Sequence, residues 1–549
     1  MRVHGSSSRR VFLAAAATAL SAPALVSRLR GAGGAPFRSR SQSRFVLEEA
    51  TLESLQAGLG SGQLTSAGLV RLYLDRIAAL DRTGPVLASV LELNPEALAI
   101  ARGLDRERRR QGPRSLLHGI PILVKDNIDT AGRMTTTAGS LALAGSIAAR
   151  DAFVVERLRA AGAIVLGKTN LSEWANFRGS RSSSGWSARG GQTRNPYVLD
   201  RNPSGSSSGS AVAVSANLCA VAVGTETDGS IISPASLCGI VGLKPTVGLV
   251  SRSGIIPISH SQDTAGPMTR TVRDAAIVLG VMAGPDPRDA ATAAASAAGA
   301  AGRDYLAGLG AAPNVAGLRV GVLRRTFEAL PAQAELLAAT LAALGTAGVA
   351  LVDPVECPRA PELGPAEFEV MLYECKAGLN TYLGGLGPSA PIHSLRELIE
   401  FNRRNAAREL AWFGQETLEL AEAKGPLTDP AYLKAVATCR RLAREEGIDG
   451  VLEKHRLDAF LSFSGGPAAV RDPVYGDRGS GGSTSPSAPA GYPCLTVPAG
   501  FVRELPVGIA FFGPAWSEPT LLQLGWAVEQ ASRRRQPPRF LPSLDSPPP

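Results

Sequence analysis

The pattern that most constrains this fold is an amphipathic helical stretch followed directly by a short apolar run, and it occurs twice. Residues 151–162 (DAFVVERLRAAG) precede the run 163–170 (AIVLGKTN), and residues 210–217 (SAVAVSAN) precede the run 218–224 (LCAVAVG). Such short runs without polar alternation are typical of strands buried on both faces. Helices that alternate with these strands pack on the two faces of one sheet, so the sequence predicts an α/β architecture.

Further elements are predicted along the chain. Helical periodicity begins near Thr51, and an amphipathic helix covers residues 520–532. Residues 362–454 have helical patterning without strand signals, and we expect a helical insertion there that covers one side of a site. The Gly/Ser/Pro-rich stretch 464–491 is expected to form a long functional loop. Other apolar runs predict strands at 120–124, 318–323, 458–463, 494–500 and 506–512.

The N-terminal segment is predicted to be an export signal. Arg9 and Arg10 precede a modestly hydrophobic stretch, residues 11–26, that is too short to span a bilayer. This arrangement resembles the twin-arginine signal, which a translocase reads on folded cargo. We therefore predict a signal and processing region at 1–35, a linker at 36–45, the twin-arginine translocase as a partner during export, and a periplasmic or secreted mature protein.

The net charge gives little support for nucleic-acid binding. The chain of 549 residues has a formal net charge of +9, but residues 1–45 contain eight arginines and no acidic residue. The remainder is nearly neutral, so we expect no nucleic-acid partner and, after signal removal, no stable membrane insertion. The six cysteines form no CxxC pair, which argues against a metal site and favours a role as buried small hydrophobic side chains.

Three segments carry the candidate chemistry. Ser206 lies in PSGSSSGSAVAV, Ser230 lies in GTETDGSIISP, and Lys125 ends the apolar run IPILV. Serine is a weak nucleophile that needs an adjacent base. None of the five histidines occurs in a recognisable base motif, and we expect His118 to cap or pack. No lysine follows a serine by three residues, which excludes the S-x-x-K pattern of penicillin-binding proteins.

Lys125 is the candidate base, because burial at the end of an apolar strand disfavours the charged amine. An unperturbed lysine with a pKa of ~10.4 is neutral only about once in 2,500 at pH 7. A downward shift of roughly 3 pH units would make the amine a useful base and would cost about 4 kcal/mol. A structural ion pair is the alternative role for a buried lysine in this position.

A second serine pattern competes for the role of nucleophile. Residues 205–209 match G-x-S-x-G with Ser207 at the centre, which is the pattern of the nucleophile elbow. The elbow requires a strand directly before the serine, whereas the preceding sequence NPYVLDRNP is typical of a loop. We therefore expect Ser207 to be a neighbour of the active centre and not its nucleophile.

Six segments together resemble the amidase signature family: HGIPILVKDNIDT, PSGSSSGSAVAV, GTETDGSIISPAS, GIVGLKPTVGLVSRSG, ISHSQDTAGPM and GYPCLTVPAG. The resemblance runs from about Phe45 to Pro542. It implies one amidase signature domain at residues 46–542, with a mixed central sheet covered by helices on both faces, and leaves a Pro-rich tail at 543–549. It also implies a Ser–cisSer–Lys triad that uses no metal and no cofactor.

Each family role falls on one residue of this sequence by its place in the motifs. The lysine base corresponds to Lys125, the bridging serine after a cis peptide bond to Ser206, and the nucleophile to Ser230. Main-chain N–H groups form the oxyanion site in this family, and donors fixed in advance suit the charge that develops there. The resemblance places those donors on Thr227, Asp228, Gly229 and Ser230.

Departures from the family pattern narrow the expected substrate. The usual GGSSGG is SGSSSG here, and the usual TDTGGS is TETDGS, with Glu226 for aspartate and Asp228 in a glycine position. Together with KTNLSEWANFRG and SGWSARGGQTRNPY, this variant is similar to the peptide amidase branch, whose members remove the C-terminal amide of peptides. We expect Asp228 either to orient the peptide backbone of the substrate or to make a structural hydrogen bond in the turn. Ser207 is expected either to hold the relay serine by hydrogen bonding or to fill the turn. Asp263 is expected to tie down loops near the site.

The sequence therefore predicts an amidohydrolase that forms an acyl-enzyme and releases ammonia from C-terminal peptide amides. Three alternatives stay open. A broad amidase would act on small aliphatic or aryl amides. A tRNA-dependent amidotransferase of the A-subunit type would act on acyl-tRNA together with partner proteins, which the export signal disfavours. A catalytically inactive amide-binding protein would bind amides without releasing ammonia.

Overall fold

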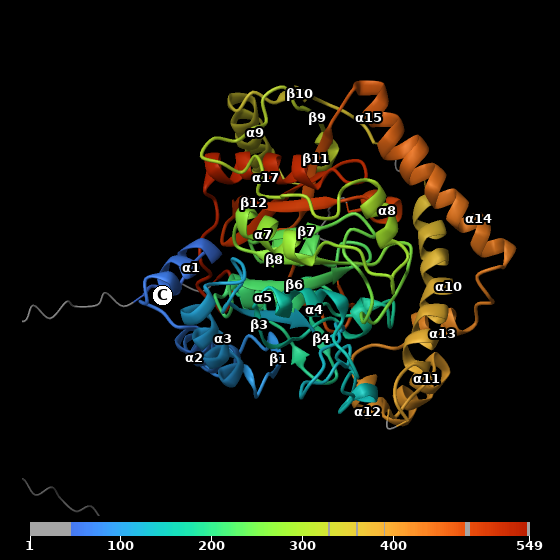
Figure 1. Ribbon diagram of the computed structural model, residues 1–549. Helices are drawn as coiled ribbons and strands as arrows, with labels where there is room; N and C mark the ends of the chain where they lie inside the picture. The colour runs from blue at the N-terminus through green and yellow to red at the C-terminus, as the bar shows by residue number, and fades with distance from the viewer. Residues whose placement is uncertain (1–44, 328–329, 358–360, 389, 478–483, 546–549) are drawn as a thin grey trace, which may run out of the picture. The chain divides into compact units, whose positions relative to one another are not determined.

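A mixed eleven-stranded sheet lies at the centre of the part of the chain that the computed structural model describes, residues 45–327, 330–357, 361–388, 390–477 and 484–545 (Figure 1). From one edge to the other its strands are β1 (Val90–Leu93), β3 (Ile164–Thr169), β2 (Pro121–Lys125), β6 (Val221–Glu226), β8 (Thr264–Thr269), β7 (Val241–Lys244), β12 (Cys494–Val502), β13 (Leu505–Phe512), β11 (Ala459–Gly465), β9 (Arg319–Val322) and β10 (Ala350–Val352). β2 is parallel to β3 and β6, and β9 is parallel to β10 and β11. The other neighbouring pairs are antiparallel, so the predicted mixed sheet is confirmed.

Helices cover both faces of this sheet, as the side chains of β12 illustrate. Successive side chains of a strand point to opposite faces. Leu495 and Val497 lie against α17 (Glu518–Ser532), whereas Thr496 points to the face that α6 (Ile232–Leu237) covers. The predicted α/β layering is therefore confirmed.

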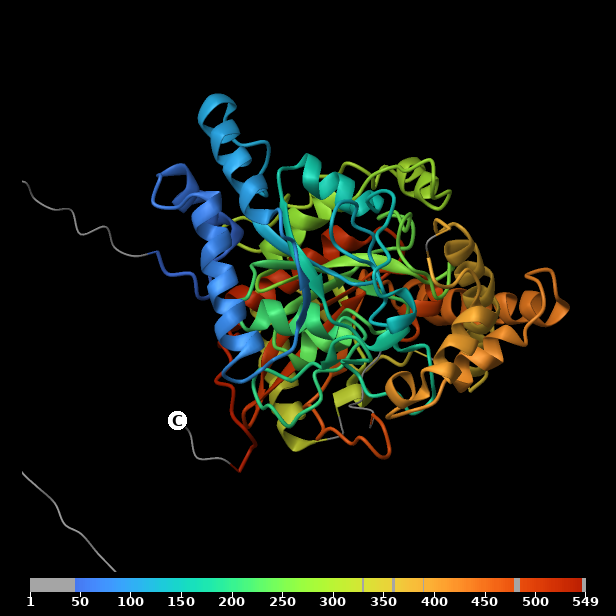
Figure 2. The same cartoon turned by 90° about the horizontal axis from the view of Figure 1, so that it is seen from below.

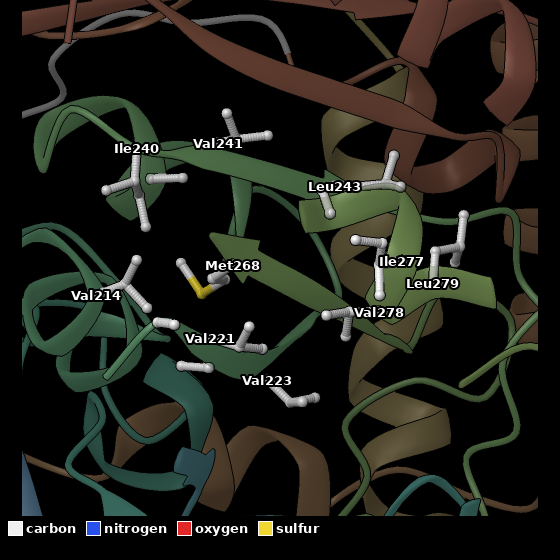
Figure 3. Packing of buried hydrophobic residues seen from close by; sticks show 14 of the residues in the cluster. Val214, Val221, Val223, Ile240, Val241, Leu243, Met268, Ile277, Val278 and Leu279 are labelled. Atoms are coloured by element: carbon white, nitrogen blue, oxygen red, sulfur yellow. The ribbon is translucent and has the colours of Figure 1, made fainter. Parts of the chain in front are cut away.

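The core lies between the central strands and the helices that flank them (Figure 3). Val221 and Val223 of β6 and Met268 of β8 are fully buried, together with residues of α5 (Ser208–Ser215) and α7 (Val272–Met282). Burial of a side chain of this size stabilises the fold by about 1.5–3 kcal/mol. The continuous apolar character of β6 is what allows it to be covered on both faces.

The helical periodicity predicted to begin near Thr51 is confirmed, and the first two helices begin at capping threonines. The side chains of Thr51 and Thr65 accept main-chain N–H bonds in the first turns of α1 (Leu52–Gly60) and α2 (Ser66–Arg76). α2 continues into a π-helical stretch, Ile77–Arg82. Figures 1 and 2 both show α1 and α2 beside α3, at one side of the sheet. The remaining elements outside the insertion are α3 (Ala97–Gln111), α4 (Phe153–Ala160), α8 (Thr292–Ala297), α9 (Pro331–Thr346), α16 (Ser487–Ala490), β4 (Trp186–Ser187), β5 (Gly191–Gln192) and 3-10 turns at Leu141–Leu143, Glu173–Asn176 and Arg324–Phe327.

The predicted helical insertion is confirmed, and its described residues contain no strand. It consists of α10 (Leu363–Gly384), α11 (Leu395–Arg404), α12 (Ala406–Glu409), α13 (Glu416–Glu422), α14 (Pro430–Cys439), a π-helical stretch (Arg440–Ile448) and α15 (Asp449–His455). In Figures 1 and 2 these yellow and orange helices lie at the side of the sheet away from α1 and α2. Leu379 of α10 and Leu418 of α13 share a hydrophobic cluster with Trp174 and Ile256, so the insertion packs onto loops that follow β3 and β7.

The predicted strands correspond to β2, β3, β6, β9, β11, β12 and β13, whereas β1, β4, β5, β7, β8 and β10 were not predicted. All six cysteines lie in the described part of the chain, and five of them are buried. Within the described ranges, no helix combines the length and the apolar character needed to cross a bilayer. The predicted signal at 1–35, nearly all of the linker at 36–45 and the end of the tail at 543–549 lie outside the described residues, so these stay predictions.

Candidate active site

The three candidate catalytic residues come from segments that meet at one edge of the sheet. Lys125 is the last residue of β2, and Ser230 follows the end of β6 by four residues. β2 and β6 are parallel neighbours with Val124 opposite Val223, so both chains leave the sheet at the same edge. Ser206 lies just before α5, which packs against both strands.

The amine of Lys125 is fully buried and reaches four oxygen atoms. Its Nζ lies 2.7 Å from Ser206 Oγ, 3.0 Å from Ser207 Oγ, 2.9 Å from Thr225 Oγ1 and 3.2 Å from the main-chain oxygen of Thr225. The structure therefore brings the predicted base and the predicted relay serine into hydrogen-bond contact. Thr225 was not a sequence candidate, although it lies in the same GTETDGS motif, and its Oγ1 also accepts a bond from Asn127 at 3.0 Å.

Burial dominates the charge state of Lys125. It lowers the pKa of the amine from 10.5 to about 7, because an ammonium group away from water is poorly solvated. The charges of Glu226 and Asp263 act in the opposite direction and raise this pKa. Near pH 7, roughly half of the amines are therefore neutral and able to accept a proton.

Other buried basic groups have structural contacts that Lys125 lacks. Lys168 Nζ lies 3.6 Å from a carboxylate oxygen of Asp126, whereas among the described residues no carboxylate forms an ion pair with Lys125. The alternative of a structural ion pair at Lys125 is therefore not supported.

The ring of His118 accepts the N–H of Arg114 and lies 3.0 Å from the carbonyl of Leu104, so this histidine packs away from the site, as expected.

The chain around Ser206 is closely packed. The peptide bond between Gly205 and Ser206 is cis, in agreement with the resemblance. The carbonyl oxygen of Ser206 accepts the N–H of Ser172 at 3.1 Å. A Cβ atom added at Gly205 would lie 2.2 Å from Ser172 Oγ, so this approach of two chain segments requires glycine.

Ser207 connects the lysine to the segment of the candidate nucleophile. Its Oγ donates to the main-chain oxygen of Thr225 at 3.0 Å, and its N–H donates to the main-chain oxygen of Ser230 at 3.1 Å. No strand occupies residues 202–206, so the chain before Ser207 lacks the strand that a nucleophile elbow requires. Ser207 is a neighbour of the lysine, as expected.

The turn at 227–230 presents main-chain N–H groups that the described part of the chain does not use elsewhere. Glu226 accepts two N–H groups at the start of α6, at 2.6 and 2.9 Å, and so holds the end of the turn. Gly229 has a φ of +77°, which favours glycine. In the described part of the chain, the N–H groups of residues 228–230 donate no hydrogen bond, so they can bind an anion.

Asp263 ties this turn to the loop before β8, as predicted. One carboxylate oxygen accepts the hydroxyl of Thr227 at 2.5 Å, and the other accepts the N–H groups of Ile258 and Ser259 at 2.8 and 2.9 Å. Burial raises the pKa of Asp263 to about 6. The residue holds loops together beside the site.

Asp228 lies two residues before Ser230 and has one free carboxylate oxygen. Its Oδ2 accepts the hydroxyl of Ser485 at 2.9 Å, whereas its Oδ1 is buried without a hydrogen-bond partner among the described residues. Burial, followed by the charge of Asp228, raises the pKa of Glu367 on α10 to about 8. The sequence did not predict a role for Glu367, since no local sequence pattern relates this residue of the insertion to the TETDGS motif.

A cavity of about 470 Å³ reaches this site. Thr225 and Thr227 line it on the side of the sheet, and Gly378 and Tyr382 of α10 line it on the side of the insertion. The insertion therefore forms one wall beside the site, as predicted.

The family assignment follows from comparison with known proteins. The amidase family profile matches residues 68–522, which include all of the site residues named above. The chain belongs to the amidase family. This amidase is accordingly an amide hydrolase, and the recognition made from its motifs is confirmed.

Three related proteins show what this amidase is similar to in sequence and structure. The native peptide amidase from Stenotrophomonas maltophilia, a solved structure, is 53% identical, with coverage of 90% of this chain and 99% of that chain and a TM-score of 0.85. A probable amidase from Arabidopsis thaliana is 41% identical over 518 residues, 92% of this chain and 95% of the relative. An amidase family protein from Bacillus anthracis, also a solved structure, is 37% identical, with coverage of 90% and 92% of the two chains and a TM-score of 0.82. The amidase is structurally close to peptide amidase.

Proposed function

We propose that this amidase hydrolyses the C-terminal carboxamide of peptides and releases ammonia. Lys125 acts as the base, Ser206 as the relay and Ser230 as the nucleophile. The observation that carries the proposal is the buried amine of Lys125, 2.7 Å from Ser206 Oγ and with a pKa of about 7. A neutral amine in this position can take a proton through the relay serine at physiological pH.

In the first half-reaction, Ser230 Oγ attacks the carbonyl carbon of the amide. Its proton passes to Ser206 Oγ as the proton of Ser206 passes to Lys125 Nζ. The oxyanion that forms is held by the free N–H groups of the turn at 227–230, which are fixed before the charge develops. When the C–N bond breaks, the relay returns the proton to the leaving nitrogen, which departs as ammonia.

In the second half-reaction, water attacks the carbonyl carbon of the ester on Ser230. The relay takes the proton of the attacking water and then returns a proton to Ser230 Oγ as the ester bond breaks. The products are a carboxylic acid, which ionises at neutral pH, and the regenerated serine.

The preference for peptides is proposed to depend on Asp228. Its buried Oδ1 has no partner among the described residues and lies on the residue two before the nucleophile. An N–H group of the peptide next to the scissile amide would supply the missing donor. A buried acceptor without a donor is costly, so a substrate that supplies one gains affinity.

The first test is a substrate panel on the mature chain. We expect kcat/KM for an amidated dipeptide to exceed that for acetamide by about 100-fold or more, because binding of the peptide can be used in the transition state. Ammonia release and the mass of the acid product are the measurements, with the dipeptide acid as the blank. Equal turnover of acetamide would identify a broad amidase. Binding of the amidated dipeptide without ammonia would identify an inactive binding protein.

Asp228→Asn is expected to lower kcat/KM for the amidated dipeptide by about 10-fold or more, since a hydrogen bond to a charged group contributes roughly 1.5–3 kcal/mol. We expect kcat for a small amide to stay within about threefold of wild type. Ser485→Ala is the matched control, because it removes the partner of Oδ2 and leaves Oδ1 in place. An equal loss on all substrates would assign Asp228 to the structure of the turn.

A further inference from the structure

Three consecutive residues after β3 have a left-handed backbone. Trp174, Ala175 and Asn176 have φ values of +51°, +53° and +72°. Residues with a Cβ atom are strained in this region, and such strain persists only where the surrounding structure holds it. These residues lie in the motif KTNLSEWANFRG, whose role the proposed triad does not explain.

The start of this strained segment lies against the proposed relay serine. The N–H of Ser172 donates to the carbonyl oxygen of Ser206 at 3.1 Å, and its Oγ accepts the N–H of Gly185 at 2.9 Å. Trp174 donates its own N–H to the carbonyl of Ala138 at 3.0 Å. A movement of residues 172–176 would therefore displace the chain that carries Ser206.

The end of the segment is locked to the helical insertion by Arg178. Its guanidinium donates to Glu173 Oε1 at 2.5 Å and to the main-chain oxygens of Glu409, Phe413 and Gly414 at 2.6, 3.1 and 3.2 Å. The side chain is fully buried and stacks 4.0 Å above the ring of Phe413. Four bonds from one rigid planar group fix the loop between α12 and α13 relative to Glu173.

The acidic partners of Arg178 have further bonds that tie the insertion to the sheet domain. Glu409 at the end of α12 accepts the N–H of Leu141 at 2.8 Å and the hydroxyl of Ser140 at 3.2 Å. Glu173 accepts the N–H of Ala188 at 2.7 Å. Between these anchors, Ala175 lines the cavity that reaches the site.

We infer that Arg178 is a positioning residue, which couples the helical insertion to Ser206 through the strained segment 174–176. The inference rests on the proposed function, in which Ser206 is the relay. Without the guanidinium, the segment loses its bonds to the loop between α12 and α13, and the left-handed residues relax toward ordinary backbone angles. Ser172 then no longer fixes Ser206 relative to Lys125, and proton transfer slows.

Arg178→Lys is expected to lower kcat by about 10-fold or more on peptide amides and small amides alike, since the relay serves both and misplacement of reacting groups is costly. KM is expected to change by less than about threefold. A lysine keeps the charge but cannot make the fan of bonds that the planar guanidinium makes. Steady-state kinetics by ammonia release measure both constants.

Arg270→Lys is the matched control. Arg270 is also buried and also donates to main-chain carbonyls, those of Val214, Cys219 and Ala50, but none of these belongs to the site. We expect both variants to lower Tm, and only Arg178→Lys to lower kcat. Glu409→Gln is a milder second variant, which keeps the main-chain bond to Arg178 and weakens the anchor.

Hydrogen–deuterium exchange tests the coupling without any substrate. Peptides that cover residues 170–178 and 204–208 are expected to exchange faster in Arg178→Lys and Glu409→Gln than in Arg270→Lys. Unchanged exchange in these peptides would overturn the inference. A kcat within about threefold of wild type in both Arg178→Lys and Glu409→Gln would also overturn it. If the wild type releases no ammonia from any amide, the proposed function fails, and the exchange comparison still decides whether Arg178 holds Ser206.

Discussion

Ser230→Ala is expected to reduce kcat for hydrolysis of an amidated dipeptide by about 10⁴-fold or more, because removal of a catalytic serine leaves only the contribution of binding and of the oxyanion site. No acyl-enzyme can form without Oγ. The turn that carries the residue is held by main-chain contacts, including the bond from the Ser207 N–H to the Ser230 carbonyl at 3.1 Å, which alanine retains. Substrate affinity is therefore expected to survive.

The loss of activity must be separated from a loss of fold. Ser233→Ala is the matched control, since Ser233 lies three residues further along the same segment and its Oγ is 2.7 Å from that of Ser204. We expect this control to retain kcat within about threefold and both variants to unfold within a few degrees of wild type. Rapid quenching with mass spectrometry should show the acyl adduct on wild type and none on Ser230→Ala. Near-normal ammonia release by Ser230→Ala would refute the assignment.

The strands that were predicted and those that were missed differ in local sequence. β2 and β6 are continuous apolar runs, which identify a buried strand. β8 was missed because Gly266 and Pro267 lie at its centre, and these residues are unusual in central strands. A Cβ at Gly266 would lie 2.0 Å from the carbonyl oxygen of Leu243, so pairing with β7 requires the glycine. Tertiary contact, not propensity, makes this segment a strand.

The candidate site likewise has a part that the sequence predicts and a part that it does not. The motifs contain Lys125, Ser206 and Ser230, and the contact of Lys125 with Ser206 follows from strand order and from the turn before α5. The side chains that hold the segments around these three residues come from distant parts of the chain. Glu409 is 231 residues from Arg178, and their contact depends on how the insertion docks. A local pattern carries no information about such docking, so these partners could not be predicted.

Lys125→Met is expected to lower kcat at pH 7 by about 10³-fold, within the range that general bases contribute. The wild-type pH profile provides the second readout. Because the amine has a pKa of about 7 and must be neutral to accept a proton, kcat/KM is expected to rise about tenfold per pH unit below pH 7 and to level off above it. Lys125→Met should lose this rise of kcat/KM with pH. Lys125→Ala should recover part of its activity only at high pH.

The same substitution gives a stability test with a defined sign. In the unfolded chain the amine keeps a pKa of ~10.4, whereas burial lowers it to about 7 in the fold, so between these values the unfolded state binds one more proton. The free energy of unfolding of wild type, relative to Lys125→Met, should therefore increase by about 1.4 kcal/mol per pH unit from pH 7 to pH 10. Urea unfolding of both proteins at several pH values measures this difference. Parallel curves across that range would show that Lys125 has an ordinary pKa in the fold, and the role of Lys125 as base would fail with it.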